Sequence, residues 1–427
     1  MDYVASRALL DRLPRFEVKP GLERIGRLLS VLGHPERSFP AIHVTGTNGK
    51  GSVVAMLAAI LQCAGYRVGR YTSPDLVDFR DRICVNGEWI SETAFATAVE
   101  RMVPELFASG DLPSQFEALT AAGFEHFRVR FVDIAVVEVG LGGRFDATNI
   151  VAPVLTVLTN VSLDHTALLG STVAEIAWEK AGIAKPSIPM LIGELHPSAE
   201  AVVTAECSAV GAPLRRTAVR VEREASASPA SASSYLVEGD DLLPRLVELP
   251  LLGVYQLDNL RLALTCVLLL RERGWCIPLD AVAAGLASVR WPGRWEVMRE
   301  KPTVLLDGAH NVAAASIVAQ GMVEWEPDRE HRALLLGVLR DKDVAGIVGA
   351  LAPHFDRIGV VASSSPRALD SDELALYVEK HVERCIRYDS VEEGVRDLVR
   401  GADPRDTILV TGSLTVVAEA RRALGGT

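Results

Sequence analysis

The fold is decided by the stretch Ala41-Ile-His-Val-Thr-Gly-Thr-Asn-Gly-Lys-Gly-Ser52. Its first five residues form an apolar, β-branched run, which predicts a buried strand. The apolar face over residues 53–64 predicts a helix, and Gly65 would end that helix. Between strand and helix, the glycines let the backbone wrap around phosphates, and Lys50 can reach their terminal oxygens. The start of the helix adds free N–H groups, so we expect a nucleotide site here.

The loop differs from the common P-loop pattern G-x-x-x-x-G-K-[ST]. That pattern would need glycine at position 44 and a hydroxyl at position 51, where this chain has Val44 and Gly51. The alternative is a glycine-rich turn that merely starts a helix. The sequence Asn-Gly-Lys-Gly-Ser between strand and helix argues against an idle turn.

Composition excludes several classes of protein. The chain has 427 residues, and 44 Lys and Arg against 55 Asp and Glu give a net charge of −11. The length predicts two or three domains, and the acidic balance argues against a nucleic-acid binder but not against anionic small substrates. Six scattered cysteines without metal-type spacing indicate reduced thiols in a cytoplasmic protein. We expect no signal peptide, because Asp, Arg and Pro interrupt the apolar positions at the N-terminus. We expect no membrane partner, because no apolar stretch is long enough to span a bilayer.

Apolar runs alternate with helical patterns along most of the chain, which predicts an α/β fold with parallel sheets. The segment 290–302 holds two prolines and a glycine before a new strand–helix series, so we place a domain boundary between residues 295 and 296. The Ser- and Ala-rich tract 223–234 is expected to be an exposed loop of the first domain. The expected strands are 41–45, 134–139, 153–159, 188–193, 303–307, 333–339, 357–362 and 406–411. The expected helices are 52–64, 115–128, 172–184, 256–273, 311–322, 391–400 and 414–424.

Several segments, spread over residues 43–413, occur in the order typical of one enzyme family. They are Gly46-Thr-Asn-Gly-Lys-Gly-Ser52, Tyr71-Thr-Ser-Pro-Asp-Leu-Val77, Glu138-Val-Gly-Leu-Gly-Gly-Arg-Phe-Asp-Ala-Thr-Asn149, Leu163-Asp-His165, Glu179-Lys-Ala-Gly-Ile-Ala-Lys185, Gln256-Leu-Asp-Asn259, Pro292-Gly-Arg-Trp-Glu296, Asp307-Gly-Ala-His-Asn311 and Thr411-Gly-Ser413. In these segments the chain resembles the dihydrofolate synthase/folylpolyglutamate synthase family of the Mur ligase superfamily.

The resemblance implies an ATP-dependent, ADP-forming ligase. Such enzymes phosphorylate a carboxylate of a pteroate or folate substrate, and the amine of L-glutamate then attacks the acyl phosphate. The implied fold is an N-terminal P-loop ATPase domain with a parallel sheet, residues 1–295, and a smaller Rossmann-like α/β glutamate-ligase domain, residues 296–427. The implied ligands are dihydropteroate or folate, L-glutamate, ATP and two Mg²⁺ ions, and we expect a monomer.

The expected metal ligands are Ser73, Glu138 and His165. Glu138 ends an all-apolar run, and a carboxylate at the buried end of a strand is costly unless it is paired or binds a metal. The residues alone therefore favour a metal role for Glu138 over emergence into solvent. From the residues alone, Ser73 is expected to be part of a turn and His165 to be a structural histidine. The resemblance instead assigns Ser73 and Glu138 to one Mg²⁺ and His165 to a second, although nitrogen ligation of Mg²⁺ is unusual.

The expected catalytic residues are Lys50, His165, Lys185 and Arg294. Lys185 ends a predicted helix before Pro186, where a lysine ordinarily complements the helix dipole. The resemblance implies that Lys185 is carbamylated and becomes an oxygen ligand of the metal site. Arg294 lies at the proposed boundary, so domain closure could bring its guanidinium to the phosphates, with a structural salt bridge as the alternative.

The resemblance also assigns ligand contacts. Asn259 would contact adenine, Asp307 the ribose and Arg294 the phosphates of ATP. The phosphate loop would contribute Gly49, Lys50, Gly51 and Ser52. His310 and Ser413 would contact glutamate or the nucleotide. The residues that would contact the pterin are Ser114, Gln115, Phe116, Phe145, Asp146 and Ala147. The chain departs from the family pattern at Ser114 and Gln115, and at Asp75 and Asp81, which puts the pterin preference in doubt.

Four functional interpretations are compared. The enzyme is bifunctional, or it is a monofunctional folylpolyglutamate synthase. A peptidoglycan-building Mur ligase is disfavoured, because no sugar-nucleotide domain precedes residue 41 and the Leu-Gly-Gly-Arg-Phe-Asp-Ala-Thr-Asn stretch is present. A nucleotide-dependent switch would need the phosphate loop but little of the C-terminal set formed by Asp307, His310 and Ser413.

Overall fold

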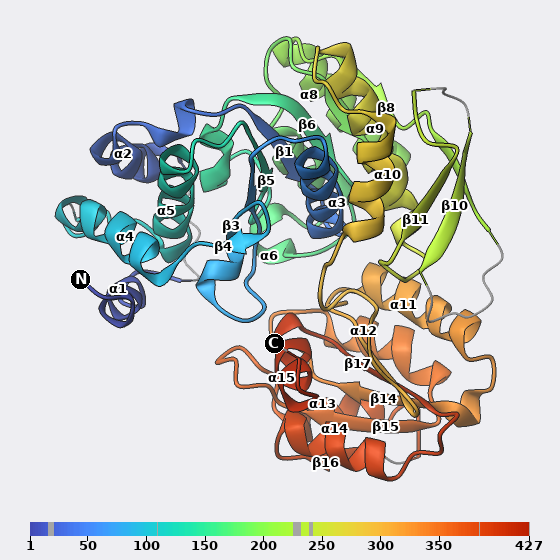
Figure 1. Ribbon diagram of the computed structural model, residues 1–427. Coiled ribbons are helices and arrows are strands. Elements are labelled where there is room, and N and C mark those ends of the chain that lie inside the picture. Colours follow the sequence, from blue (N-terminus) through green and yellow to red (C-terminus); the bar gives the residue numbers. More distant parts are fainter. Residues whose placement is uncertain (16–20, 109, 225–231, 239–241, 384, 427) are drawn as a thin grey trace.

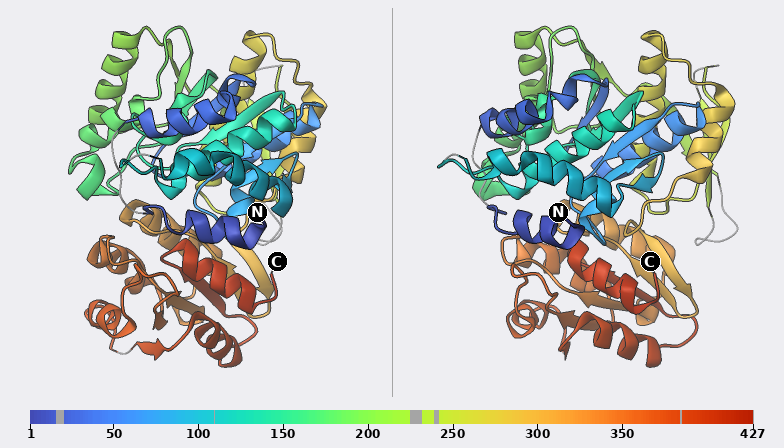
Figure 2. Two further views of the ribbon diagram at one scale, coloured as in Figure 1. Left: turned by 90° about the vertical axis from the view of Figure 1, so that its left-hand side faces the viewer. Right: turned by 60° about the vertical axis from the view of Figure 1, so that its left-hand side comes forward.

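The computed structural model describes residues 1–15, 21–108, 110–224, 232–238, 242–383 and 385–426. It consists of two α/β parts, and the C-terminal part packs below the N-terminal part in Figure 1 and in both views of Figure 2. Residues 225–231 of the Ser- and Ala-rich tract lie outside the described residues, and the expected loop 223–234 is shorter than predicted, because Arg223 ends one strand and the buried Ser233 begins the next. The expected α/β class is confirmed.

The N-terminal part is organised around an eight-stranded sheet in the described residues, in the order β4-β3-β2-β5-β1-β6-β7-β8. Strand β1 lies between β5 and β6 and is parallel to both, with His43 opposite Val137 and Thr156. The strands are β1 (Ala41–Thr45), β2 (Val68–Tyr71), β3 (Ile83–Val85), β4 (Glu88–Trp89), β5 (Ile134–Glu138), β6 (Pro153–Leu158), β7 (Met190–Ile192) and β8 (Leu214–Arg216). Because parallel strands end at one edge, the residues that follow β1, β2, β5 and β6 gather around one site.

Helices cover both faces of this sheet. They are α1 (Tyr3–Leu10), α2 (Glu23–Leu32), α3 (Lys50–Cys63), α4 (Glu92–Leu106), α5 (Gln115–Val129), α6 (Thr166–Leu169), α7 (Val173–Ala181), α8 (Pro197–Val210), α9 (Gln256–Glu272) and α10 (Leu279–Ser288). Short 3₁₀ turns cover Pro35–Arg37, Phe79–Arg82 and Ala147–Ile150. Helix α3, which starts at the phosphate loop, packs against α9 and α10. A Cβ on Gly285 of α10 would lie 2.5 Å from the Ile60 Cα, so the two helices are in backbone contact. This packing holds α3 rigidly behind the loop.

A small antiparallel sheet, β11-β10-β9, lies beside α9 and α10. Its strands are β9 (Arg220–Arg223), β10 (Ser233–Glu238) and β11 (Leu246–Leu249). After it the chain enters α9 and α10 and then crosses to the C-terminal part.

The C-terminal part has a six-stranded sheet in the described residues, in the order β12-β13-β17-β14-β15-β16. Its strands are β12 (Glu296–Glu300), β13 (Thr303–Leu306), β14 (Arg332–Leu336), β15 (Arg357–Val361), β16 (Ile386–Tyr388) and β17 (Thr407–Thr411). Its helices are α11 (Val312–Trp325), α12 (Val344–Leu351), α13 (Ser371–Val378), α14 (Val391–Arg400) and α15 (Leu414–Ala423), with 3₁₀ turns at Arg329–His331 and Ala352–His354. Loops after β13 and β14 contact loops of the N-terminal part.

Each strand and helix predicted from the sequence is present, although the bounds shift by a few residues. The expectation of parallel sheets was wrong at the edges. Strands β3, β4 and β12 pair antiparallel to their neighbours. The β3–β4 hairpin turns at Asn86-Gly87, with both residues in the left-handed region (φ 50° and 80°), which is the geometry that Asn-Gly favours.

In the described part of the chain, no helix is both long and apolar enough to cross a membrane.

Candidate active site

The phosphate loop lies between β1 and α3, as the sequence predicted. Gly49 adopts a left-handed conformation (φ 83°) and caps α3, so the free N–H groups of the first turn follow the loop directly. The Lys50 Nζ atom donates to the carbonyl oxygens of Gly46 and Thr47, both at 3.0 Å. Burial lowers the pKa of Lys50, while the charges of Glu138 and Asp164 oppose that shift. Lys50 is thus held in the loop near two carboxylates.

Position 51 has no room for a side chain. A Cβ on Gly51 would lie 2.7 Å from the indole ring of Trp291, in the segment that leads to the C-terminal part. The hydroxyl that the common P-loop pattern puts at this position would therefore clash with that ring. The next residue, Ser52, is buried, and its Oγ accepts a hydrogen bond from the Gln256 amide at 3.4 Å.

Lys180, rather than Lys185, reaches the phosphate loop. The Lys180 Nζ atom is buried and donates to the Gly46 carbonyl at 2.9 Å. Lys185 instead donates to Asn149, to the backbone oxygen at 3.2 Å and to Oδ1 at 2.8 Å. Burial, and next the charge of Lys50, lower the pKa of Lys180 to about 7. The amine of Lys180 is therefore partly neutral near neutral pH, as a reactive amine must be.

We expect Lys180→Met to change how the free energy of unfolding depends on pH. The unfolded lysine has a pKa near 10.4, so between about pH 7 and 10 the unfolded chain binds a proton that the folded chain lacks. This difference makes the wild-type protein more stable as pH rises through that window, by on the order of 3 kcal/mol, and the variant lacks the increment. Urea unfolding at pH 6.5 and 9.5 measures it, and the exposed Lys380→Met is the control. An equal difference between variant and wild type at both pH values would contradict the assignment.

Glu138 and Ser73 come together at the ends of β5 and β2. The Glu138 side chain is 4% exposed, and the Ser73 N–H donates to its Oε2 at 3.4 Å. Burial raises the pKa of Glu138, and the charges of Lys50 and Arg294 lower it in part. A buried carboxylate with one long hydrogen bond keeps free acceptor positions, and carboxylate and hydroxyl oxygens, such as those of Glu138 and Ser73, are ligands that Mg²⁺ prefers. These two residues fit a magnesium site.

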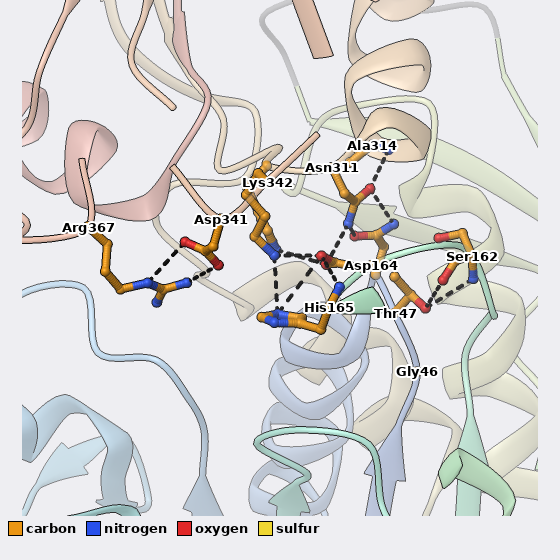
Figure 3. Close-up of polar contacts among 12 residues, drawn as sticks. Gly46, Thr47, Ser162, Asp164, His165, Asn311, Ala314, Asp341, Lys342 and Arg367 are labelled. Atoms are coloured by element: carbon orange, nitrogen blue, oxygen red, sulfur yellow. Dashed lines mark hydrogen bonds and ion pairs between the residues drawn. The ribbon is translucent and has the colours of Figure 1, made fainter. Parts of the chain in front are cut away.

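A cluster of side chains from both parts of the chain surrounds Asp164 (Figure 3). The Lys342 Nζ lies 2.5 Å from Asp164 Oδ1, and the Asn311 amide donates to Oδ2 at 3.1 Å. Asn311 also exchanges hydrogen bonds with Asn48 of the phosphate loop at 3.0 and 3.3 Å. Burial would raise the pKa of Asp164, but His310, Lys342 and His165 together hold it below its usual range. The loops after β13 and β14 are therefore bonded directly to the nucleotide side.

His165 belongs to the same cluster. It has a left-handed backbone (φ 50°) at the start of α6, and its Nε2 lies 3.1 Å from Lys342 Nζ. Burial, and next the charge of Lys342, lower the pKa of His165 to about 4, so the imidazole is neutral and its nitrogen can accept. Lys342 already donates to that nitrogen, so a metal at Nε2 would have to displace the ammonium. Across the described residues no group of three or more His, Cys, Asp or Glu side chains is arranged to hold a metal ion.

His310 faces Asp164, with its Nε2 3.6 Å from Oδ2 and its Nδ1 2.8 Å from the Gly308 carbonyl. Burial lowers the pKa of His310 to about 4, so Nδ1–H donates to the carbonyl and Nε2 is an acceptor. Ser413 is buried, and its Oγ caps α15 by accepting from the Val416 N–H at 3.3 Å.

Of the residues expected to contact ATP, Asn259 touches the phosphate loop, whereas Asp307 follows β13 in the C-terminal part. Asn259 presses on Gly49, because a Cβ there would be 2.3 Å from the Asn259 Oδ1. The charge of Arg294 acts on Lys50 and Glu138, which puts its guanidinium on the phosphate side. Asp307 is 3% exposed and is already bonded to Tyr255.

The stretch at the start of α5 is mostly structural. Ser114 caps α5 in a capping box with Glu117, and the Gln115 amide donates to the Leu10 carbonyl and to Asp11. These two side chains are bonded within the chain and do not present themselves to a ligand. Phe116 does line the site, because a Cβ on Gly140 would lie 2.5 Å from its ring.

The second expected pterin stretch follows β5. Phe145 is 42% exposed, whereas Ala147 is buried. Asp146 Oδ1 accepts from the N–H and hydroxyl of Thr148, and Oδ2 accepts from the Leu141 N–H at 2.9 Å. The Gly140 N–H is also a backbone hydrogen-bond donor to this carboxylate, so Asp146 is held chiefly by bonds within the chain.

The two acidic residues at which the chain departs from the family pattern are also used internally. Asp75 pairs with Arg82, and Asp81 accepts backbone N–H bonds from Leu76 and Val77.

The sequence did not single out four residues of this site. Lys180 stood in the quoted Glu179–Lys185 segment, but the second lysine of that segment was chosen. Asp164 stood beside His165 without a role. Lys342 and Tyr255 had no signal beyond their position after or before a predicted element.

A phosphate loop facing a second α/β sheet across shared polar residues defines a Mur-type nucleotide-dependent ligase. Residues 293–414 match the family model described as "Mur ligase, glutamate ligase domain". The chain is 39% identical, over 99% of its length, to the Haloferax volcanii "Probable bifunctional folylpolyglutamate synthase/dihydropteroate synthase" and spans about half the length of that relative. It is 38% identical to the Mycobacterium tuberculosis "Dihydrofolate synthase/folylpolyglutamate synthase", over 98% of this chain and 93% of the relative.

Comparison with solved structures indicates the same family as these relatives. The M. tuberculosis folylpolyglutamate synthase complexed with ADP and AMPPCP matches at a TM-score of 0.88, 36% identity and full coverage of both chains. The E. coli protein FolC in complex with DHPP and ADP matches at 0.85 and 30% identity, over 100% of this chain and 98% of that one. The chain belongs to the dihydrofolate synthase/folylpolyglutamate synthase family.

Proposed function

We propose that this protein is an ATP-dependent, ADP-forming ligase that adds L-glutamate to dihydropteroate and to folate polyglutamates through an acyl phosphate. One observation carries the proposal: Asn48 of the phosphate loop and the nearby Asp164 carboxylate contact Lys342, His310 and Asn311, which follow strands of the second sheet. Two sheets that meet at one site can hold a nucleotide and an amino acid together. The Mycobacterium tuberculosis relative, which is named for both a dihydrofolate synthase and a folylpolyglutamate synthase, and the E. coli structure with DHPP and ADP support both activities.

In the proposed reaction, different residues bind the nucleotide, the pterin and glutamate. The α3 N-terminus and Lys50 bind the ATP phosphates, and Arg294 balances the charge that develops on the transferred phosphoryl group. Phe116 and Phe145, beside the Asp146 loop, receive the pterin. His310 and Lys342 approach from the second sheet, where a neutral imidazole and an ammonium suit the amine and carboxylate of glutamate. Closure of the two parts excludes water from the acyl phosphate.

Mg²⁺ would be held by Glu138 and Ser73, and it would supply charge stabilisation for the phosphates. His165 is the candidate for a second ion and would first have to lose its bond from Lys342. If one lysine is carbamylated, Lys180 fits better than Lys185, because its buried amine, with a pKa of about 7, lies at the phosphate loop. We further propose a division into domains 1–295 and 296–427, which the start of β12 at Glu296 supports, and a cytoplasmic monomer.

ADP release by the purified protein with ATP, Mg²⁺ and L-glutamate tests the function. The reaction is compared with 7,8-dihydropteroate, with tetrahydrofolate and with neither. Release with both pterins supports the bifunctional enzyme, and release with tetrahydrofolate alone reduces the proposal to a folylpolyglutamate synthase. Equal release in all three reactions would overturn the ligase and favour a nucleotide-dependent switch.

A further inference from the structure

Three separate segments of the chain meet at the carboxylate of Asp307, just after β13. Its Oδ2 accepts a hydrogen bond from the Tyr255 hydroxyl at 2.6 Å and another from the Trp295 N–H at 3.0 Å. Its Oδ1 accepts from the Ala309 N–H at 2.9 Å. The carboxylate is buried, so each of these bonds is made out of contact with bulk water.

The three segments carry the expected nucleotide contacts. Tyr255 immediately precedes α9 and stands one helical turn before Asn259. Trp295 follows Arg294 directly and adopts a left-handed backbone (φ 50°), which a bulky residue rarely does. Its indole packs on α11, where a Cβ on Gly321 would be 2.7 Å from the ring. The bonds to Asp307 therefore tie the adenine, ribose and phosphate contacts into one unit.

The bonds also decide which oxygen of Asp307 a ligand can reach. An ionised carboxylate has about four acceptor positions, two on each oxygen. Tyr255 and Trp295 fill both positions of Oδ2, and Ala309 fills one of Oδ1, so one position on Oδ1 remains. Burial raises the pKa of Tyr255 well above its usual value, so the phenol is protonated and acts as the donor.

We propose that Tyr255 is a positioning residue for the nucleotide, which holds Asp307 so that the free acceptor position of Oδ1 faces the ribose hydroxyls. This inference rests on the proposed function, in which Asp307 contacts the ribose of ATP. Without the phenol, Oδ2 has an empty position of its own, and the buried carboxylate can turn to fill it. The ribose hydroxyls then lose a fixed partner, while the phosphate loop keeps its own contacts.

The test measures the binding of ATP and of 2′,3′-dideoxy-ATP, without pterin or glutamate, to the wild-type protein and to Tyr255→Phe. Tyr388→Phe is the matched control, because the buried Tyr388 also donates to a carboxylate, that of Asp397, at 2.9 Å and lies on the distant strand β16. We expect the wild-type protein and Tyr388→Phe to bind ATP about ten-fold more tightly than the dideoxy analogue. In Tyr255→Phe we expect that ratio to fall below about three-fold, chiefly through weaker ATP binding.

Thermal unfolding of each variant shows that it is folded before binding is measured. An unchanged ratio in Tyr255→Phe would overturn the inference, since the phenol would then serve stability alone. An equal loss of the ratio in Tyr388→Phe would also overturn it, because the effect would be general loosening. A wild-type protein that binds both nucleotides equally would refute the ribose contact and this inference with it, whereas pterin-dependent ADP release would still uphold the ligase.

Discussion

We expect Glu138→Gln to lower the rate of ADP formation at least about 10³-fold and to leave the protein at least as stable as the wild type. The two effects have one cause. The carboxylate is buried at the end of β5 with a single long hydrogen bond from Ser73, so its charge serves a cation rather than the fold. The glutamine has the same shape but cannot supply that charge.

The sign of the stability change follows from the raised pKa of Glu138. Between the pKa of about 4.3 in the unfolded chain and the raised value in the folded protein, the folded state binds the extra proton. Stability therefore falls as pH rises through this window, because ionising the buried carboxylate carries a desolvation penalty. Glutamine is neutral throughout, so we expect its free energy of unfolding at pH 7.5 to be unchanged or about 1–2 kcal/mol higher.

Glu125→Gln is the matched control. Glu125 is equally buried but pairs with Arg101 and Arg128, so its loss leaves both guanidiniums short of a partner. We expect Glu125→Gln to lower stability by about 1–3 kcal/mol and to leave ADP formation unchanged. Urea unfolding and ADP release measure both quantities. A Glu138→Gln protein that is destabilised as much as Glu125→Gln would show that Glu138 is a structural residue.

The sequence predicted the strands, loops and helices that carry the site, because local sequence patterns determine them. The β1–loop–α3 unit follows from an apolar run, glycines and a helical face, and the place of Glu138 follows from the end of an all-apolar strand. Such features depend on neighbours in the chain. They place Lys50, Glu138 and Asp307 correctly at the ends of their elements.

The site predictions that the structure does not support concern residues whose contacts are with distant segments of the chain. Lys180 and Lys185 are five positions apart in one segment, and only the packed structure shows that the first reaches Gly46 and the second Asn149. Gln115 was expected at the pterin, but α1 offers it the Leu10 carbonyl and the Asp11 carboxylate. Lys342 comes from a loop far along the chain, and no local pattern indicates that it pairs with Asp164.

Lys342→Met and Asp164→Asn should each lower the free energy of unfolding by about 3–5 kcal/mol, because each variant leaves the other charge buried without its main partner. The side chains of Lys342 and Asp164 are 5% and 8% exposed, so solvent cannot replace the lost bond. The pair joins the loop after β14 to the loop after β6, and we also expect a loss of at least about 100-fold in kcat/KM for glutamate.

The double variant measures the interaction between the two charges apart from the interactions that each makes with other groups. If the two charges chiefly stabilise each other, removing both should cost clearly less than the sum of the single losses, with a coupling of about 1–3 kcal/mol. Activity should not recover in the double variant, because the ammonium beside His165, to which the proposed function gives a role in binding glutamate, is still missing. Urea unfolding and steady-state kinetics of the four proteins measure both effects. The exposed pair Arg340–Glu373, treated in the same way, is the control, and its coupling should stay below about 1 kcal/mol. Additive stability losses at Asp164 and Lys342 would show that each acts through other partners, and the junction between the two sheets would then rest on Asn311 and Asn48 instead.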